Sequence, residues 1–392
     1  MKPLDLAAWA AALLLSSSLF AHTIALRLLL LLAGLGLVAA AIVRDRHSLR
    51  LLPPLWIPLA LWAAWAFASL GWSLEPQRTA KELQNEIGYS AAVFWLCFVA
   101  GQARRSAYVF LPLVGAAAVA VCANAIYAFP RIMDGWSGGP GNLSSALLVL
   151  LPCAAATAWY ARRAAWPLAF RAAPILLAVG ALAAASTALS RTFWLALAAQ
   201  IASTALLLAV KRNGPRTYRT ATVLLAAAAV ALAAAAMTFR VQTEREALGA
   251  RVMEEDPRLV LWKEVAERIE QRPWTGYGFG RGILRVDLRD ELKVAQLWHA
   301  HNLFLDTALQ LGAPGVALLL VLLAATFREG WRLARDPSPA AMACGIAVVA
   351  VLAGMLVRNM TDVLLVRQNA LLYWGVIGVL LAWGARSRAA TL

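Results

Sequence analysis

Apolar runs of about 20 residues recur along the whole chain, and this feature constrains the fold more than any other. About 20 helical residues cross the hydrocarbon core of a bilayer, whereas the strands of a membrane barrel are about ten residues long and alternate in polarity. Of the 392 residues, 61% are hydrophobic and only 15% are charged, which excludes a soluble globular enzyme and a disordered chain. The sequence therefore predicts an all-α polytopic membrane protein.

The apolar runs predict about twelve membrane-spanning helices. Their expected ranges are 6–21, 24–43, 52–71, 87–101, 108–129, 143–161, 172–189, 192–210, 220–238, 302–326, 341–357 and 368–385. The first run also resembles a secretory signal peptide. Because a second run begins almost at once, we expect an uncleaved first helix.

Lysine and arginine are divided unevenly between the two sets of short loops. With the N-terminus in the cytoplasm, the cytoplasmic loops hold 18 basic and four acidic residues, and the short outer loops hold six basic residues. The positive-inside rule then predicts that both termini are cytoplasmic. We therefore interpret the net charge of +15 as a topology signal and do not expect nucleic-acid binding. Each of the four cysteines lies inside an apolar run, which predicts packing rather than a disulfide or a metal site: Cys97, Cys122, Cys153 and Cys344.

Residues 239–301 form one long outer stretch with 11 basic and 11 acidic residues, which is the composition of a small folded cap. Residues 258–272 have the pattern of an amphipathic helix, and a second helix is expected from about 282 to 297. The glycine-rich segment 274–280 between them predicts irregular backbone that lets the cap lie close to the membrane. The expected organisation is helices 1–9 over residues 1–238, the cap over 239–301, and helices 10–12 over 302–392.

Two histidines lie where the cap meets the tenth predicted helix, His299 and His301. Imidazole is suited to proton transfer near neutral pH. The alternative is an interfacial histidine that is hydrogen-bonded to backbone. The His-Ala-His sequence has no cysteine partner and no HExxH pattern, so we predict no metal site.

Two arginines are placed at the same outer boundary. Arg191 lies in the tight turn between predicted helices 7 and 8, where a charge is expensive unless it faces a cavity or a partner. A snorkelling side chain at a helix end is the alternative. Arg258 opens the predicted cap helix, where backbone N–H groups also favour anions. Its alternative is an ordinary solvated surface charge.

These residue types together suit transfer from a lipid diphosphate. Arginine binds diphosphate through forked hydrogen bonds and offsets charge on a phosphate leaving group without a metal. Histidine can take the proton from an incoming hydroxyl. The segment 276–280 resembles a nucleotide fingerprint only superficially, since no strand precedes it. A transporter is the alternative from another class, but its polar residues would lie at mid-membrane, where Arg27 is the main charge here.

Five short motifs occur in order between residues 190 and 316. They are SRTFW at 190–194, RLVLW at 258–262, RPWTGYGFG at 272–280, HNLFL at 301–305 and LGAPG at 311–315. The ordered set resembles the O-antigen ligase family, which also contains O-antigen polymerase-like proteins and O-linked protein oligosaccharyltransferases. The other helices match that family only in hydropathy and number. The single large outer loop late in the chain is most similar to the ligase itself.

The resemblance implies a C-type glycosyltransferase in the bacterial inner membrane, with its active site on the periplasmic side and no cofactor. Its donor would be O-antigen on undecaprenyl diphosphate, and its acceptor a terminal sugar of lipid A core. The essential histidine of the family maps to His301, and its two essential arginines map to Arg191 and Arg258. Direct displacement would invert the anomeric centre. An O-antigen polymerase or a protein O-oligosaccharyltransferase with the same donor stays an alternative. Further substrate contacts are expected from location alone: Lys81, Arg78, His299 and Arg281.

Overall fold

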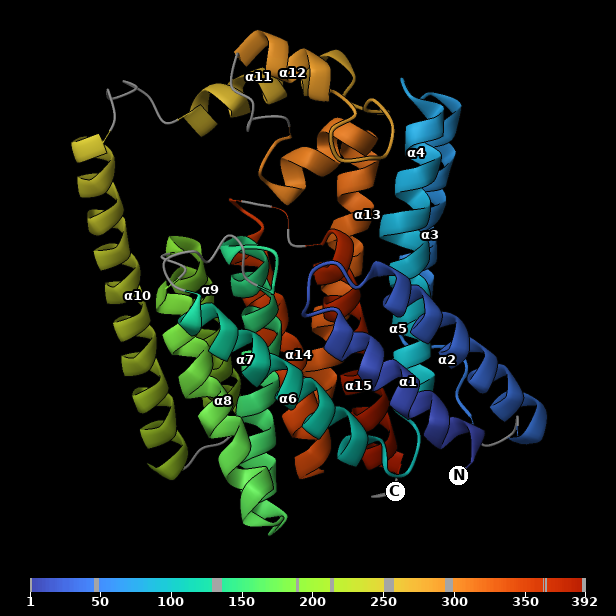
Figure 1. Ribbon diagram of the computed structural model, residues 1–392, viewed down its shortest axis with the longest axis vertical. Coiled ribbons are helices and arrows are strands. Elements are labelled where there is room, and N and C mark those ends of the chain that lie inside the picture. Colours follow the sequence, from blue (N-terminus) through green and yellow to red (C-terminus); the bar gives the residue numbers. More distant parts are fainter. Residues whose placement is uncertain are drawn as a thin grey trace.

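The computed structural model describes residues 2–45, 49–128, 136–187, 190–211, 215–249, 257–292, 299–361, 363 and 365–389, and every regular element in these ranges is helical (Figure 1). The first half contains α1 (Pro3–Ser17), α2 (Ile24–Asp45), α3 (Trp56–Ala68), the 3-10 turn η2 (Ser69–Gly71), α4 (Pro76–Glu82), the π-helical segment η3 (Leu83–Gly88), α5 (Tyr89–Ala100), α6 (Ser106–Tyr127), α7 (Pro140–Arg163) and α8 (Leu168–Thr187). The second half contains α9 (Arg191–Lys211), α10 (Pro215–Gly249), α11 (Pro257–Gln271), α12 (Arg285–Leu292), α13 (Leu303–Ala334), α14 (Pro339–Arg358) and α15 (Arg367–Ala389).

The all-α polytopic prediction is confirmed, and every predicted apolar run contains a helix. Within the described residues, nine helices are long and apolar enough to cross a membrane. Three further apolar helices are shorter: α1 has 15 residues, α3 has 13 and α5 has 12. A straight crossing needs about 20 residues, so the number twelve stays a prediction.

The helices form an antiparallel bundle with two different ends. The short helices α11 and α12 lie over one end, which we call the cap end (Figure 1). The N- and C-termini lie at the opposite end, which we call the termini end (Figure 1). The protein therefore consists of a long apolar helix bundle and a small, more polar cap at one of its ends.

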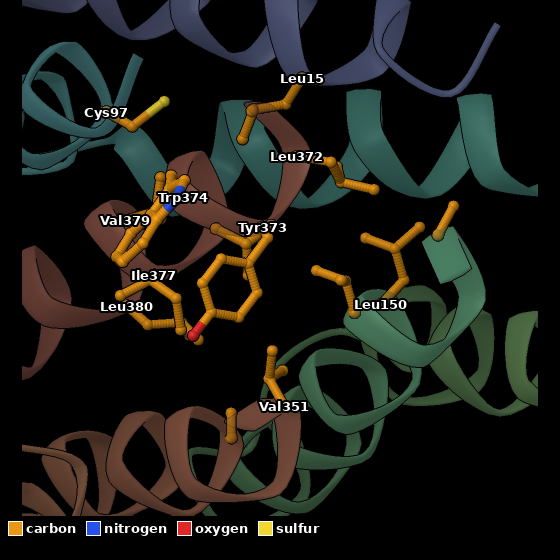
Figure 2. Packing of buried hydrophobic residues seen from close by; sticks show 14 of the residues in the cluster. Leu15, Cys97, Leu150, Val351, Leu372, Tyr373, Trp374, Ile377, Val379 and Leu380 are labelled. Atoms are coloured by element: carbon orange, nitrogen blue, oxygen red, sulfur yellow. The ribbon is translucent and has the colours of Figure 1, made fainter. Parts of the chain in front are cut away.

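The centre of the bundle is formed around α15, which packs against α5, α14 and α7. Figure 2 shows Tyr373 of α15 among Leu15 of α1, Leu150 of α7 and Val351 of α14. Glycine allows the closest of these approaches, because a Cβ on Gly378 would lie 2.6 Å from the Phe94 carbonyl oxygen of α5. Small residues are the usual means of packing helices in a membrane, where lipid is as apolar as leucine.

The predicted cap helix over 258–272 is confirmed as α11. The second cap helix begins later than expected, at Arg285, and the structure describes it to Leu292. The later start follows from Gly280 and Gly282, whose φ angles of +138° and +85° are incompatible with a right-handed helix. The expected residues 293–297 lie outside the described part of the chain. The expected boundary at 238/239 falls inside α10.

A break divides α13 near the cap end. Gly312 has φ 66° and ψ −169°, and the N–H of Ala313 donates to the carbonyl oxygen of Pro273 at 2.8 Å instead of continuing the helix. Residues 303–311 are thus a separate short helix above the longer one. The predicted span over 302–326 did not include this break, which lies at a glycine with positive φ, two residues before Pro314.

Candidate functional site

The predicted histidines lie in a four-residue turn, the histidine turn (residues 299–302), that leads into α13 at the cap end. Asn302 caps the helix, since its Oδ1 accepts hydrogen bonds from the N–H groups of Phe304 at 2.9 Å and Leu305 at 3.2 Å. His301 precedes this cap with φ 48°, in the left-handed region that glycine or asparagine adopts more readily. The backbone conformation at residue 301 is therefore less favourable for histidine than it would be for glycine.

The histidine turn is bonded on one side to the cap and on the other to the bundle. Trp262 of α11 donates from Nε1 to the Ala300 carbonyl oxygen at 2.9 Å. Asn302 donates from Nδ2 to the Met360 carbonyl oxygen at 3.1 Å. The N–H of Leu303 donates to the Asn359 carbonyl oxygen at 2.9 Å. The residues that follow α14 and Trp262 of α11 therefore both hold the histidine turn in place.

The two imidazole rings are in contact but differ in exposure. Their centroids are 3.8 Å apart, and the N–H of His301 donates to Nδ1 of His299 at 3.0 Å. Nδ1 of His299 is thus an acceptor, which leaves Nε2 to carry the proton of a neutral ring. His299 is buried, with 4% of its surface exposed, and His301 is only partly buried. His301 is therefore the histidine that a substrate reaches more readily.

Asp306 lies one turn into α13 and ties the histidine turn to the cap. It is buried, and its Oδ1 accepts from the N–H of Ala300 at 3.4 Å. Its Oδ2 accepts from Nε2 of Gln310 at 2.8 Å. The carboxylate also interacts electrostatically with Arg281 and His301. Asp306 is thus a buried acid at the site that the sequence did not assign a role.

The glycine loop (residues 276–280) lies between α13 and the segment that connects α3 to α4. The N–H of Gly278 donates to the Gln310 carbonyl oxygen at 2.9 Å, and the N–H of Phe279 donates to Oγ of Ser69 at 3.0 Å. Gly276 has φ +62°, and a Cβ there would lie 2.5 Å from the carbonyl carbon of Gln310. The predicted irregular backbone is confirmed. Its glycines permit close backbone contact between the cap and the bundle.

Glu86 in η3 is a site residue that the sequence analysis missed. Its Oε2 accepts a hydrogen bond from the N–H of Arg367 at 2.8 Å. Burial raises the pKa of Glu86 to about 7, although that bond and the charges of Arg281 and Arg367 act in the opposite direction. The signal in the sequence is an acid between the apolar residues Leu83 and Ile87. Arg281 thus interacts electrostatically with two acids, the partly buried Glu86 and the buried Asp306.

The predicted contacts on α4 stand beside the glycine loop rather than in the histidine turn. A Cβ on Gly280 would lie 3.1 Å from Cγ of Glu82, next to Lys81. Lys81 is exposed, and Arg78 forms an ion pair with Glu75 in which Nη1 and Oε1 are 3.5 Å apart. The structure therefore groups His299 and Arg281 with His301, and leaves Arg78 and Lys81 on a neighbouring surface.

Arg191 and Arg258 are described by their backbone, and their side chains lie outside the described part of the chain. Arg191 is the first residue of α9, which packs antiparallel to α14. A Cβ on Gly354 of α14 would touch Gln200 of α9, so the start of α9 lies at the same end as Arg358. Arg258 lies one turn before Trp262, which bonds to the histidine turn. The backbones of the three predicted catalytic residues thus share the cap end.

The cap end also gathers helix N-termini. Among the described helices, α7, α9, α13 and α15 all begin there. Each N-terminus carries partial positive charge and favours an anion. Arg358 at the end of α14 is buried, and its Nη2 would lie 3.8 Å from a Cβ on Gly141 at the start of α7. The local electrostatics therefore favour a negatively charged group. No three His, Cys, Asp or Glu residues of the described chain form a group that could hold a metal ion.

Residues 175–320 match the family model described as O-antigen ligase. This range runs from α8 to the middle of α13 and includes Arg191, Arg258, the glycine loop and the histidine turn. No curated protein matches the chain. The matched range coincides with the five ordered motifs and with the parts that meet at the cap end. Residues 175–320 of the chain are therefore similar to the O-antigen ligase family.

Proposed function

We propose that this protein is an O-antigen ligase. It moves the O-antigen glycan from undecaprenyl diphosphate to a terminal sugar of lipid A core, at the periplasmic face of the bacterial inner membrane. The observation that carries the proposal is the position of His301. It is partly exposed, lies between cap and bundle, and sits at the end where α7, α9, α13 and α15 begin. Both a sugar hydroxyl of the lipid A core and a membrane-held diphosphate reach such a boundary.

His301 acts as the general base in this proposal. Its imidazole takes the proton from the acceptor hydroxyl as the oxygen attacks the anomeric carbon. A new glycosidic C–O bond forms, the bond between the anomeric carbon and the phosphate oxygen breaks, and undecaprenyl diphosphate leaves with the bonding electrons. Displacement in one step inverts the anomeric centre.

Arg191 and Arg258 bind the diphosphate and offset its growing negative charge. The helix N-termini and Arg358 at the cap end add to the same attraction. Arg281 and His299 are assigned to substrate contacts next to His301, and Arg78 and Lys81 to contacts with the glycan from α4. The reaction so described uses no nucleotide sugar and no metal ion.

Reconstitution with purified components tests this function. The full-length protein is mixed with undecaprenyl-diphosphate glycan and rough lipopolysaccharide, with a chelator and no nucleotide. We expect a ladder of glycan-bearing lipopolysaccharide on a gel. Longer lipid-linked glycan instead of this ladder would show a polymerase. Transfer only to a Ser-containing acceptor protein would show a protein O-oligosaccharyltransferase, and no product beside an active control enzyme would favour a transporter.

Replacing His301 tests the base. His301→Gly removes the imidazole while relieving the left-handed backbone at φ 48°, so the variant is expected to fold and to lose about 100-fold or more of its transfer rate. His22→Gly is the matched control, because His22 also has a left-handed backbone, at φ 60°, and lies between α1 and α2. Near-normal transfer by His301→Gly would rule out the base assignment.

Arg191→Lys keeps the positive charge but loses the forked donor geometry. We expect a loss of transfer of at least about tenfold, since a forked pair gives two charge-assisted hydrogen bonds to the diphosphate. Initial rates at saturating acceptor measure this loss. An unchanged rate would show that Arg191 does not bind the diphosphate in a bidentate manner.

A further inference from the structure

A large cavity lies far from the histidine turn, at the termini end of the bundle. Its volume is about 750 Å³, and it is lined by residues of α1, α6, α7, α8, α14 and α15. Its mouth is formed by Arg104, which precedes α6, and by Arg386, near the end of α15. Both residues are exposed and belong to the end that holds the chain termini. The proposed transfer reaction uses neither residue.

The walls of this cavity are apolar and small. A Cβ on Gly115 in the middle of α6 would meet no atom within 4 Å, so the space beside it is open. The described lining residues include no acid. Of the candidate membrane spans, α8 is the least buried in the protein, with 17% of its apolar window covered. The cavity thus lies beside a helix most of whose apolar surface is not covered by the described protein.

Four aromatic rings form a cluster at the mouth, from Tyr108, Tyr160, Trp166 and Phe170. Tyr108 stacks on Trp166 with ring centroids 5.5 Å apart, and Phe170 meets the edge of both rings. Tyrosine and tryptophan collect at the level of lipid headgroups in a bilayer. The mouth therefore lies at the membrane–water interface, and the apolar walls extend from it toward the bilayer centre.

We propose that this cavity binds an anionic glycerophospholipid. Its phosphate lies at Arg104 and Arg386, and an acyl chain fills the space beside Gly115 between α6 and α8. Basic pockets between membrane helices bind the headgroups of anionic lipids. Arg386 already donates hydrogen bonds to the carbonyl oxygens of Gln102 and Ala103, which fixes its guanidinium at the mouth. The absence of an acid among the described lining residues disfavours a lipid ammonium group.

The donor lipid of the proposed reaction would need its charged group at the end of the bundle opposite to the arginines of this cavity. A polyprenyl diphosphate that reacts at His301 has its charged group at the cap end, whereas the two arginines stand at the termini end. The cavity is therefore assigned to a structural lipid of the opposite leaflet, which packs α8 onto the bundle.

Native mass spectrometry of the full-length protein in detergent tests the proposal. Phosphatidylglycerol and phosphatidylcholine of equal chain length are titrated separately. We expect phosphatidylglycerol to bind more tightly, and Arg104→Gln to weaken it about fivefold with little effect on phosphatidylcholine. Arg105→Gln is the matched control, because Arg105 is an exposed neighbour that does not line the cavity. Equal binding of the two lipids by the wild type would overturn the proposal.

A steric variant tests the acyl site without changing charge. Gly115→Leu fills the open space, and we expect it to reduce bound phosphatidylglycerol at least tenfold. Gly36→Leu is the control, because Gly36 on α2 also faces open space but lies outside the cavity. Equal lipid binding by the two leucine variants would refute the assignment. Displacement of phosphatidylglycerol by undecaprenyl phosphate from the same Gly115-sensitive site would also refute it, and would assign the cavity to the donor lipid.

Discussion

At the scale of single residues, two buried tyrosines differ in whether their hydroxyl groups have hydrogen-bond partners. The Tyr373 hydroxyl is fully buried and has no hydrogen-bond partner among the described residues (Figure 2). The Tyr277 hydroxyl lies 3.1 Å from both the Arg268 carbonyl oxygen and Oε1 of Gln271. We expect Tyr373→Phe to stabilise the protein and Tyr277→Phe to destabilise it, each by about 1 kcal/mol. Thermal unfolding in detergent measures both stability changes. A loss of stability in Tyr373→Phe would show that the Tyr373 hydroxyl does have a hydrogen-bond partner.

Glu86 is expected to make stability depend on pH. Its folded-state pKa of about 7 exceeds the unfolded value of 4.5, so the folded state holds the proton more tightly. Stability from this group is therefore fully present below pH 4.5 and is lost as pH rises to about 7. Glu86→Gln keeps an oxygen acceptor for the Arg367 N–H and removes the titration.

The advantage of Glu86→Gln should grow by about 2 kcal/mol between pH 5 and pH 8 and level off above the folded-state pKa. Thermal unfolding temperatures of variant and wild type at several pH values measure the difference. Glu75→Gln, an exposed acid on the same side of the membrane, is the control. Parallel pH curves for wild type and Glu86→Gln would show that Glu86 does not titrate in this way.

The sequence predicts individual site residues only where their chemistry is unusual for their position. His301 is a candidate from the sequence because imidazole suits proton transfer near neutral pH and because it lies in a motif of the family that the sequence resembles. Its role stays a prediction. Glu86 is not a candidate from the sequence, because its partner Arg367 is 281 positions away in the chain. Burial and long-range pairing change the chemistry of an acid, and neither is visible in a local pattern.

At the scale of secondary structure elements, the break in α13 controls how the histidine turn is held. A Cβ on Gly312 would lie 2.4 Å from the carbonyl carbon of Trp274, and its φ of +66° is unfavourable for alanine. We expect Gly312→Ala to destabilise the protein by at least about 2 kcal/mol. The measurement is thermal unfolding beside Gly36→Ala, whose Cβ meets nothing within 4 Å. Equal stability of the two variants would show that the break is not required.

Helix positions follow from the apolar runs because a membrane demands long apolar helices, and each run indeed contains one. The breaks within helices are less predictable. The sequence around Gly312 contains the breaking residues, but the left-handed turn depends on the approach of Pro273 and Trp274 from the cap. The π-helical segment η3 was not predicted, and it contains Glu86, which accepts the hydrogen bond from the Arg367 N–H.

At the scale of the whole molecule, the uneven distribution of basic residues predicts which end of the bundle faces the periplasm, and cysteine labelling tests it. We expect Lys81→Cys, an exposed position at the cap end, to react with a membrane-impermeant maleimide in right-side-out spheroplasts. Arg328→Cys, exposed near the other end of α13, should react only in inside-out vesicles. The opposite pattern would reverse the predicted topology. The native cysteines give little background, because three of the four are buried.

The order and direction of the helices could be predicted from hydropathy and charge, but their neighbours could not. α5 and α15 form close contacts although they are nearly 300 positions apart, and the contact depends on glycines of α15 meeting backbone of α5. In a membrane, every helix surface is apolar, so hydropathy does not mark which faces pair. The cavity at the termini end could not be predicted for the same reason, because residues of six helices line it.

The histidine turn connects the cap to the bundle by hydrogen bonds on both of its sides. Its Ala300 accepts from Trp262 of α11, and its Asn302 and Leu303 donate to the carbonyl oxygens of Met360 and Asn359, just after α14. The position of His301 therefore depends on the cap and on the bundle together. In the proposed reaction, a displacement of α11 relative to the end of α14 would shift the imidazole that we assign as the base.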